Sequence, residues 1–154
     1  MNFCELSFRS HVDSIPLSDF LSTSLGVDRN LVGEEMEYWD RVGTDHPLAV
    51  GVQVQWSELG YKTFLKWIQK AEVSGPQLLT IVLAAAKEFD SEVAAGDVLS
   101  PTESLPGQFM VAKPDGTVYK AVELSNGDQF ELALNSSPVE AAHIRKLFGQ
   151  LEQI

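Results

Sequence analysis

Three histidines and one cysteine are the side chains of this 154-residue chain best suited to catalysis or metal binding near neutral pH. A zinc site or a hydrolytic centre needs several His, Cys, Asp or Glu side chains that converge. His11, His46 and His143 are far apart in sequence, and no pair has the i, i+4 spacing of a helical zinc site. We therefore expect each histidine to be exposed or hydrogen-bonded rather than catalytic.

The cysteine and the glycines give no stronger signal for chemistry. Cys4 lies in an alternating apolar segment, where we expect it to be a small buried hydrophobe. A lone cysteine forms no internal disulfide, which agrees with a reducing compartment. The chain has no G-x-G-x-x-G motif, and Gly60 with the Tyr-Lys-Thr that follows matches only the tail of a phosphate-binding loop. The sequence predicts no enzyme activity, no cofactor and no metal site.

An acidic segment is the other candidate for chemistry. It contains Glu34, Glu35, Glu37 and Asp40, whose carboxylates could in principle bind a cation. If the segment is a strand, Glu35 and Glu37 share one face, whereas Glu34 shares the other with apolar neighbours. Because the carboxylates are then split across the sheet, we expect a solvated edge or outer face.

Charge narrows the choice of partner. The chain has 22 acidic and 11 basic residues and a net charge of −11. Its acids concentrate in residues 1–60 and 87–131, whereas residues 61–86 are slightly basic. The negative net charge disfavours binding to nucleic acids and to anionic membranes, and it favours binding to a basic protein. The alternative is that the acidity only keeps the protein soluble.

Composition indicates an ordinary globular protein. Apolar residues make up 44% of the chain, and its length suits one domain. The longest nearly apolar run, residues 78–86, is far shorter than the roughly 20 residues of a membrane-spanning helix. The first residues have neither a basic leader nor an apolar signal core, so we expect a cytoplasmic location.

The apolar periodicity predicts a series of elements that would position these residues. We expect a strand at 3–9, a helix at 16–25 ended by Gly26, and a β-hairpin of strands 31–40 and 48–56. Residues 61–70 fit either a helix or a strand, and we favour the helix. A buried central helix at 75–89 and a short strand within 91–99 follow.

The remaining third of the chain is expected to be a loop, a meander and a helix. Two prolines exclude regular structure from residues 100–107. Strands at 108–113, 117–124 and 129–134 are joined by the turns 114–116 and 125–128, which contain Asp-Gly and Asn-Gly. Ser137 and Glu140 form a capping box that predicts a helix from that point through Leu151.

Together these elements predict one α+β domain over residues 1–154, with a largely antiparallel sheet, a buried central helix and a C-terminal helix. The expected core comprises Leu6, Phe8, Phe20, Leu21, Val52, Val54, Phe64, Leu79, Val82, Leu83, Val111, Val118, Phe130, Leu132, Ile144 and Phe148.

The acidic segment at residues 34–40, which also contains Tyr38 and Trp39, and the order of helix, strand and hairpin up to Gly116 give the chain a resemblance to a known class. It resembles the immunity proteins of bacterial polymorphic toxin systems. This resemblance implies tight binding of a toxin and occlusion of its active site, without catalysis by the chain itself. The expected partner-binding residues are Glu34, Glu35, Glu37, Tyr38, Trp39, Asp40 and Asp45, although Tyr38 could instead belong to the core.

Two alternatives stay open. Type III secretion chaperones are also small, acidic α/β proteins that hold an effector segment, but that family is expected to start with a helix, whereas this chain starts with a predicted strand. A small enzyme or ligand-binding domain could form a pocket from Trp56, Tyr61 and Trp67, although we expect these aromatics to pack in the core. The sequence also leaves open whether the chain is a monomer or a homodimer.

Overall fold

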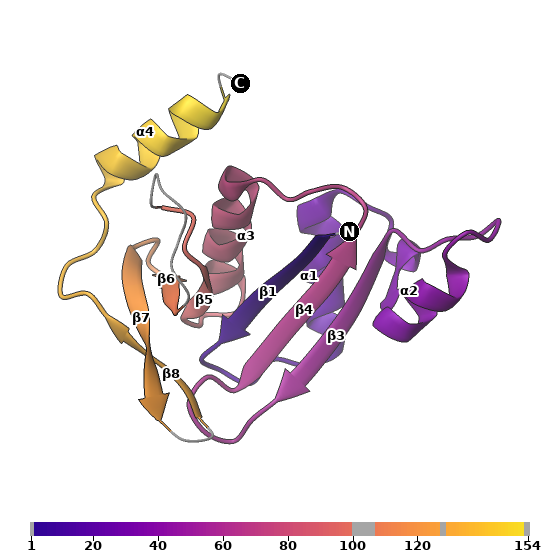
Figure 1. Cartoon of the computed structure of the whole chain (residues 1–154), viewed down its shortest axis with the longest axis horizontal. Helices are drawn as coiled ribbons and strands as arrows, with labels where there is room; N and C mark the ends of the chain where they lie inside the picture. Colours follow the sequence, from indigo (N-terminus) through magenta and orange to yellow (C-terminus); the bar gives the residue numbers. More distant parts are fainter. Residues whose placement is uncertain (1, 100–106, 127–128, 153–154) are drawn as a thin grey trace.

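Eight strands form one sheet in the order β2-β3-β4-β1-β5-β6-β7-β8 in the computed structural model, which describes residues 2–99, 107–126 and 129–152 (Figure 1). The strands are β1 (Asn2–Phe8), β2 (Val32–Glu34), β3 (Val50–Trp56), β4 (Thr63–Gln69), β5 (Val93–Gly96), β6 (Gln108–Ala112), β7 (Val118–Asn126) and β8 (Gln129–Leu134). The helices are α1 (Ser14–Leu25), α2 (Glu35–Arg41), α3 (Gly75–Glu88) and α4 (Ala141–Glu152). Neighbouring strands are antiparallel except β2 and β3, so the predicted α+β class with a largely antiparallel sheet is confirmed.

Local sequence signals place several elements where they were predicted. β1 alternates inward and outward side chains, and α1 ends at Gly26, which has the left-handed conformation (φ 67°) that glycine adopts without strain. The side chain of Ser74 accepts a hydrogen bond from the backbone N–H of Gln77 and caps α3. β6, β7 and β8 form the expected meander.

The predicted strand at 31–40 and the hairpin built on it are wrong. Only Val32–Glu34 is a strand, and it pairs with β3 in parallel rather than as a hairpin. The chain then turns into α2, which has Glu35 and Glu37 in its first turn and Arg41 in its last. These charges complement the helix dipole, which favours acids at the N-terminal end and bases at the C-terminal end.

The predicted helix at 61–70 is also wrong, because this segment contains β4. The strand pairs along its whole length with β1 on one side and β3 on the other. Thr63, Leu65 and Trp67 are buried on alternate positions, as in a central strand. Apolar residues on both faces of a buried strand can also fit a helical template, and the long-range pairing decides between them.

Three predicted details near the C-terminus differ from the structure or lie outside the described residues. Ser137 does not cap α4, since the helix begins at Ala141 and the carbonyl of Glu140 accepts from the backbone N–H groups of His143 and Ile144. Nearly all of the predicted loop at 100–107 and half of the turn at 125–128 lie outside the described residues. Phe148 lies in α4, but its side chain is also outside them.

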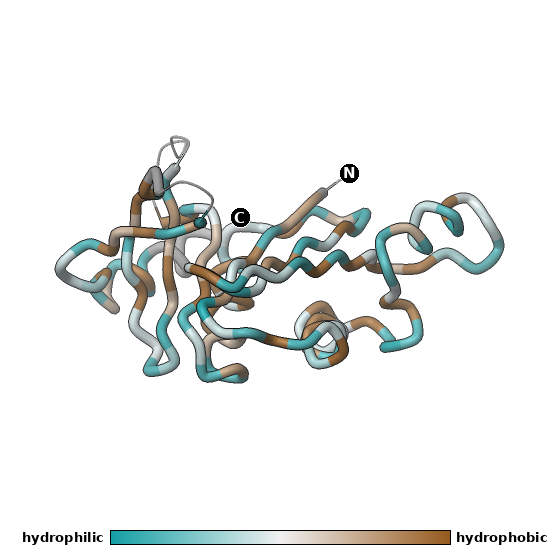
Figure 2. Tube along the Cα trace, turned by 90° about the horizontal axis from the view of Figure 1, so that it is seen from below, coloured by the Kyte–Doolittle hydropathy of each residue, from teal (hydrophilic) through white to brown (hydrophobic). Residues whose placement is uncertain are grey.

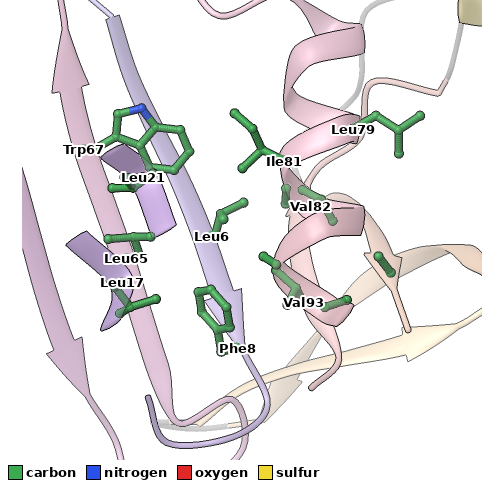
Figure 3. Close-up of a cluster of buried hydrophobic side chains, with 14 of the residues drawn as sticks. Leu6, Phe8, Leu17, Leu21, Leu65, Trp67, Leu79, Ile81, Val82 and Val93 are labelled. Carbon is green, nitrogen blue, oxygen red and sulfur yellow. The ribbon is translucent and has the colours of Figure 1, made fainter. Parts of the chain in front are cut away.

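The main core lies between one face of the sheet and the two helices α1 and α3. Figure 3 shows Leu6 and Phe8 from β1 and Trp67 from β4 beside Leu17 of α1 and Val82 of α3. α3 is the most buried of the helices in the described part, as its apolar sequence predicts. Of the predicted core residues with described side chains, Phe20, Val54, Phe64, Leu83, Phe130 and Ile144 are half-buried and the rest are buried.

Within the described residues, two smaller clusters of buried residues lie apart from the main core, one toward each end of the sheet. At one end β6, β7 and β8 pack around Tyr61, whose backbone N–H donates to the carbonyl of Phe130 at 3.2 Å. At the other end α2 packs its Tyr38 against Ile68. Figure 2 shows α2 and the loop that follows it projecting from this second end of the molecule.

Candidate functional site

The candidate site is built on α2, and the position of Tyr38 determines how this helix is oriented. Tyr38 is buried, and its Cβ lies directly beside Gly51. A Cβ added to Gly51 would be 2.6 Å from the Cβ of Tyr38. Glycine at this position therefore lets the helix lie close to β3. Tyr38 belongs to the core, which was the alternative assignment for this residue.

The outer side of α2 presents an apolar and an acidic side chain together. Residues four apart share one side of a helix, so Met36 and Asp40 lie opposite the buried Tyr38. Met36 is 79% exposed, and Trp39, beside Asp40, is 41% exposed. The ring of Trp39 packs edge-on against Tyr38, with centroids 5.5 Å apart, which gives the exposed indole a fixed support. We call five exposed residues the acidic-aromatic surface: Glu34 at the start of α2, Met36, Trp39 and Asp40 within it, and Asp45 in the loop that follows.

The acids around α2 fall into two groups. Glu35 forms an ion pair with Lys66 (3.4 Å), and Glu37 forms one with Arg41 (3.2 Å). Glu34, Asp40 and Asp45 are exposed and make no ion pair within the residues that the structure describes. These last three carboxylates are available to a cationic partner.

Sequence reasoning missed Met36 as a surface residue because it treated the segment as a strand. In a strand, Met36 would share its face with Tyr38, whereas on the helix the two side chains point away from each other. The detectable signal was the placement of two glutamates before, and one arginine after, the aromatic pair. The prediction that the carboxylates are split between two sheet faces is also wrong, because residues 35–41 form a helix.

The residues first considered for chemistry do not converge in the described part of the chain. His11 hydrogen-bonds Asp13 (3.0 Å) and stacks on Trp56, while His46 and His143 are exposed elsewhere. Burial raises the pKa of the Cys4 thiol to about 11, which disfavours the reactive thiolate. No group of three or more His, Cys, Asp or Glu side chains that could hold a metal ion occurs among residues 2–99, 107–126 and 129–152.

A polar cluster lies at the other end of the sheet. Arg9 forms two short contacts with the Glu131 carboxylate (2.8 and 2.9 Å), and its guanidinium lies 4.5 Å above the ring of Tyr61. Glu92 is 3.8 Å from both Arg9 and Lys113. These contacts connect β8 and the residues flanking β1, β5 and β6, so the cluster has a structural explanation.

The Tyr61 hydroxyl is buried and has no hydrogen-bond partner in the described part of the protein. Burial, assisted by Glu92, raises its pKa to about 12. Trp56, Tyr61 and Trp67 do not form a shared pocket: Tyr61 and Trp67 are fully buried in different clusters, whereas Trp56 is 49% exposed.

Comparison with known proteins adds no relative. No family model matches the chain, and no significant match was found among curated proteins or among solved structures. Within the described residues, every helix is too short or too polar to cross a membrane.

Proposed function

We propose that this protein is a cytoplasmic immunity-type inhibitor that binds a toxin with a basic surface and occludes the toxin's active site. The observation that carries the proposal is the acidic-aromatic surface, where Trp39 and Met36 are exposed on the helix that also carries Asp40, and where Glu34, Asp40 and Asp45 make no ion pair within the described residues. A helix that projects from the end of the sheet can enter a cleft of the partner more readily than a flat sheet face can.

Charge and apolar contact have different roles in this proposal. The carboxylates of Glu34, Asp40 and Asp45 attract a cationic surface and orient it, which mainly raises the association rate. Trp39 is exposed in the free protein and becomes the anchor when the partner buries it. Aromatic residues that lose their water on binding dominate the binding energy of many interfaces. Its support against Tyr38 means that little side-chain freedom is lost on binding.

Inhibition is stoichiometric in this proposal. The protein covers the partner's active site for as long as the complex lasts and leaves the partner chemically unchanged. The complex forms in the cytoplasm, where it protects the cell that makes the toxin.

The experiment uses the product of the neighbouring gene as the candidate toxin and measures its binding kinetics with purified protein. Trp39→Ala should accelerate dissociation by about 30-fold, which corresponds to about 2 kcal/mol. Asp40→Asn should instead slow association and reduce its dependence on salt. Leu59→Ser is the matched control, since Leu59 is 59% exposed but lies away from α2.

Protection of cells should need about one copy of this protein per toxin molecule. Protection at far lower amounts, or recovery of a covalently altered toxin, would contradict occlusion. Unchanged kinetics for both Trp39→Ala and Asp40→Asn would remove α2 from the interface.

A further inference from the structure

The two edges of the sheet differ in how they are covered. At β8, the backbone of Tyr61 donates to Phe130, and Gly60 lies so close that a Cβ would be 2.5 Å from the Phe130 carbonyl oxygen. At the opposite edge, β2 pairs only with Val50, Gly51 and Val52 of β3. Residues 53–56 of β3 therefore have β4 on one side and no strand on the other among the described residues.

Residues 53–56 of β3 have none of the side chains that usually prevent a further strand from pairing with an exposed sheet edge. Native edges often carry lysine, proline or inward-pointing charges, which prevent another strand from adding. Here the edge consists of Gln53, Val54, Gln55 and Trp56, none of which is charged. The edge is thus chemically competent to accept a strand.

A groove of about 630 Å³ runs along this edge. Ile15 of α1 lines the groove on the side of the main core, together with Val54 and Trp56. Met36 of α2 lines it on the side of the opposite sheet face, together with Gln53. Ile15 and Met36 are 69% and 79% exposed. β2 ends at Glu34, where the chain turns into α2 and leaves the edge of β3. A further strand that continued in the direction of β2 would therefore lie between α1 and α2.

The walls of the groove differ in chemistry. The α1 side presents the exposed Ile15 between the uncharged Ser14 and Ser18, whereas the α2 side carries Glu34, Glu35 and Glu37. Glu35 and Glu37 are paired with Lys66 and Arg41, and Arg29, the single basic residue of the lining, is paired with Asp19 at 2.6 Å. Glu34 makes no ion pair within the described residues, so its carboxylate is the one in the lining that is available to a cation. Because side chains of a strand alternate between its faces, an added strand would place every second residue against each wall.

We propose that an extended segment of the basic protein partner adds to β3 as a strand beside residues 53–56, with alternating apolar and basic side chains. Its apolar residues pack against Ile15, Val54 and Trp56, and its lysines or arginines face the carboxylates of the α2 side. This inference rests on the proposed function, since it specifies how the same partner binds. A second copy of this chain is a poorer occupant, because two chains of net charge −11 repel each other.

The probe is a seven-residue peptide, capped at both ends, in which lysine alternates with valine or isoleucine. Two further peptides carry N-methyl groups on the odd-numbered or on the even-numbered amides. Only one edge of an added strand bonds to β3, so one methylated peptide should lose at least tenfold in affinity while the other retains binding. Hydrogen exchange should slow at the β3 amides that the strand covers.

Protein variants test the walls independently of the peptide backbone. The double variant Ile15→Ser with Met36→Ser should weaken the unmethylated peptide at least tenfold, and Leu59→Ser should leave its affinity unchanged. Replacing the lysines of the peptide with glutamates should abolish binding. All three protein positions are exposed, so the variants should fold.

Equal affinity of both methylated peptides would overturn strand addition, and so would a peptide that fails to bind or binds independently of the walls. Formation of a homodimer that is lost in the Ile15 and Met36 double variant would assign the edge to a second copy. Trp39 does not line the groove, so its variant separates the two proposals. If Trp39→Ala weakens the whole partner but the peptide does not bind, the groove proposal fails and the α2 interface stands. If the peptide binds and Trp39→Ala leaves the affinity for the whole partner unchanged, the groove proposal stands and Trp39 is not the anchor of the interface.

Discussion

Replacing Tyr61 by phenylalanine should stabilise the protein, although most substitutions of fully buried residues destabilise. The Tyr61 hydroxyl is buried without a hydrogen-bond partner in the described structure, and such a group costs about 1–3 kcal/mol. Phenylalanine retains the edge-on contact with Phe130 (5.5 Å) and the position under the Arg9 guanidinium (4.5 Å). We expect a gain of about 1 kcal/mol at pH 7 and a rise in Tm of about 3 °C.

The same residue should control stability in alkali. The unfolded tyrosine ionises near its usual pKa of 10.0, whereas burial holds the folded pKa at about 12. As pH rises above 10, the unfolded state loses this proton first, so the free energy of unfolding falls. A difference of about two pKa units corresponds to a loss of roughly 2–3 kcal/mol, which Tyr61→Phe should remove.

Urea unfolding followed by tryptophan fluorescence at pH 7 and at several values between 9 and 12 measures both effects. Tyr119→Phe is the control, because Tyr119 is half-buried and packs under Lys113 without belonging to the buried cluster. Its stability and pH profile should match those of the wild type. A loss of stability in Tyr61→Phe at pH 7, or an alkaline profile equal to that of the wild type, would refute the assignment of an unpartnered hydroxyl.

Three further perturbations test other parts of the structure. Gly51→Ala should lower the free energy of unfolding by about 1–3 kcal/mol, since the new Cβ would lie 2.6 Å from the Cβ of Tyr38; an unchanged urea midpoint would contradict this packing. The hydrogen bond from Arg9 lowers the pKa of Glu131, so the pair stabilises the protein above the usual carboxyl pKa of 4.5 and loses this effect as pH falls below it. Thermal melts from pH 6 to 3 should show that Glu131→Gln removes roughly 1 kcal/mol of this dependence, and parallel profiles would argue against it. Cys4 should react with a disulfide reagent at pH 8 at least tenfold more slowly in the folded protein than in urea, because its pKa of about 11 leaves little thiolate, and equal rates would show an accessible thiolate.

Local sequence determined those elements whose signals are complete within a few residues. The alternation in β1, the left-handed glycine at the end of α1 and the Asp-Gly turn between β6 and β7 act over short distances. These features need no knowledge of what packs against them, so the fold class and most of the core could be predicted.

Tertiary structure decided the elements whose sequence fits two templates. Residues 63–69 are a strand because β1, about sixty positions away in the chain, pairs with them on one side and β3 on the other. Residues 35–41 are a helix whose Tyr38 fits against Gly51, and this contact turns Met36 outward. The candidate site depended on this second choice, because a strand and a helix place the same acids and aromatics on different sides. The apolar periodicity of a segment describes that segment alone. The uncovered edge of β3 depends on two strands, because β2 stops after three residues and no other described strand continues beside β3.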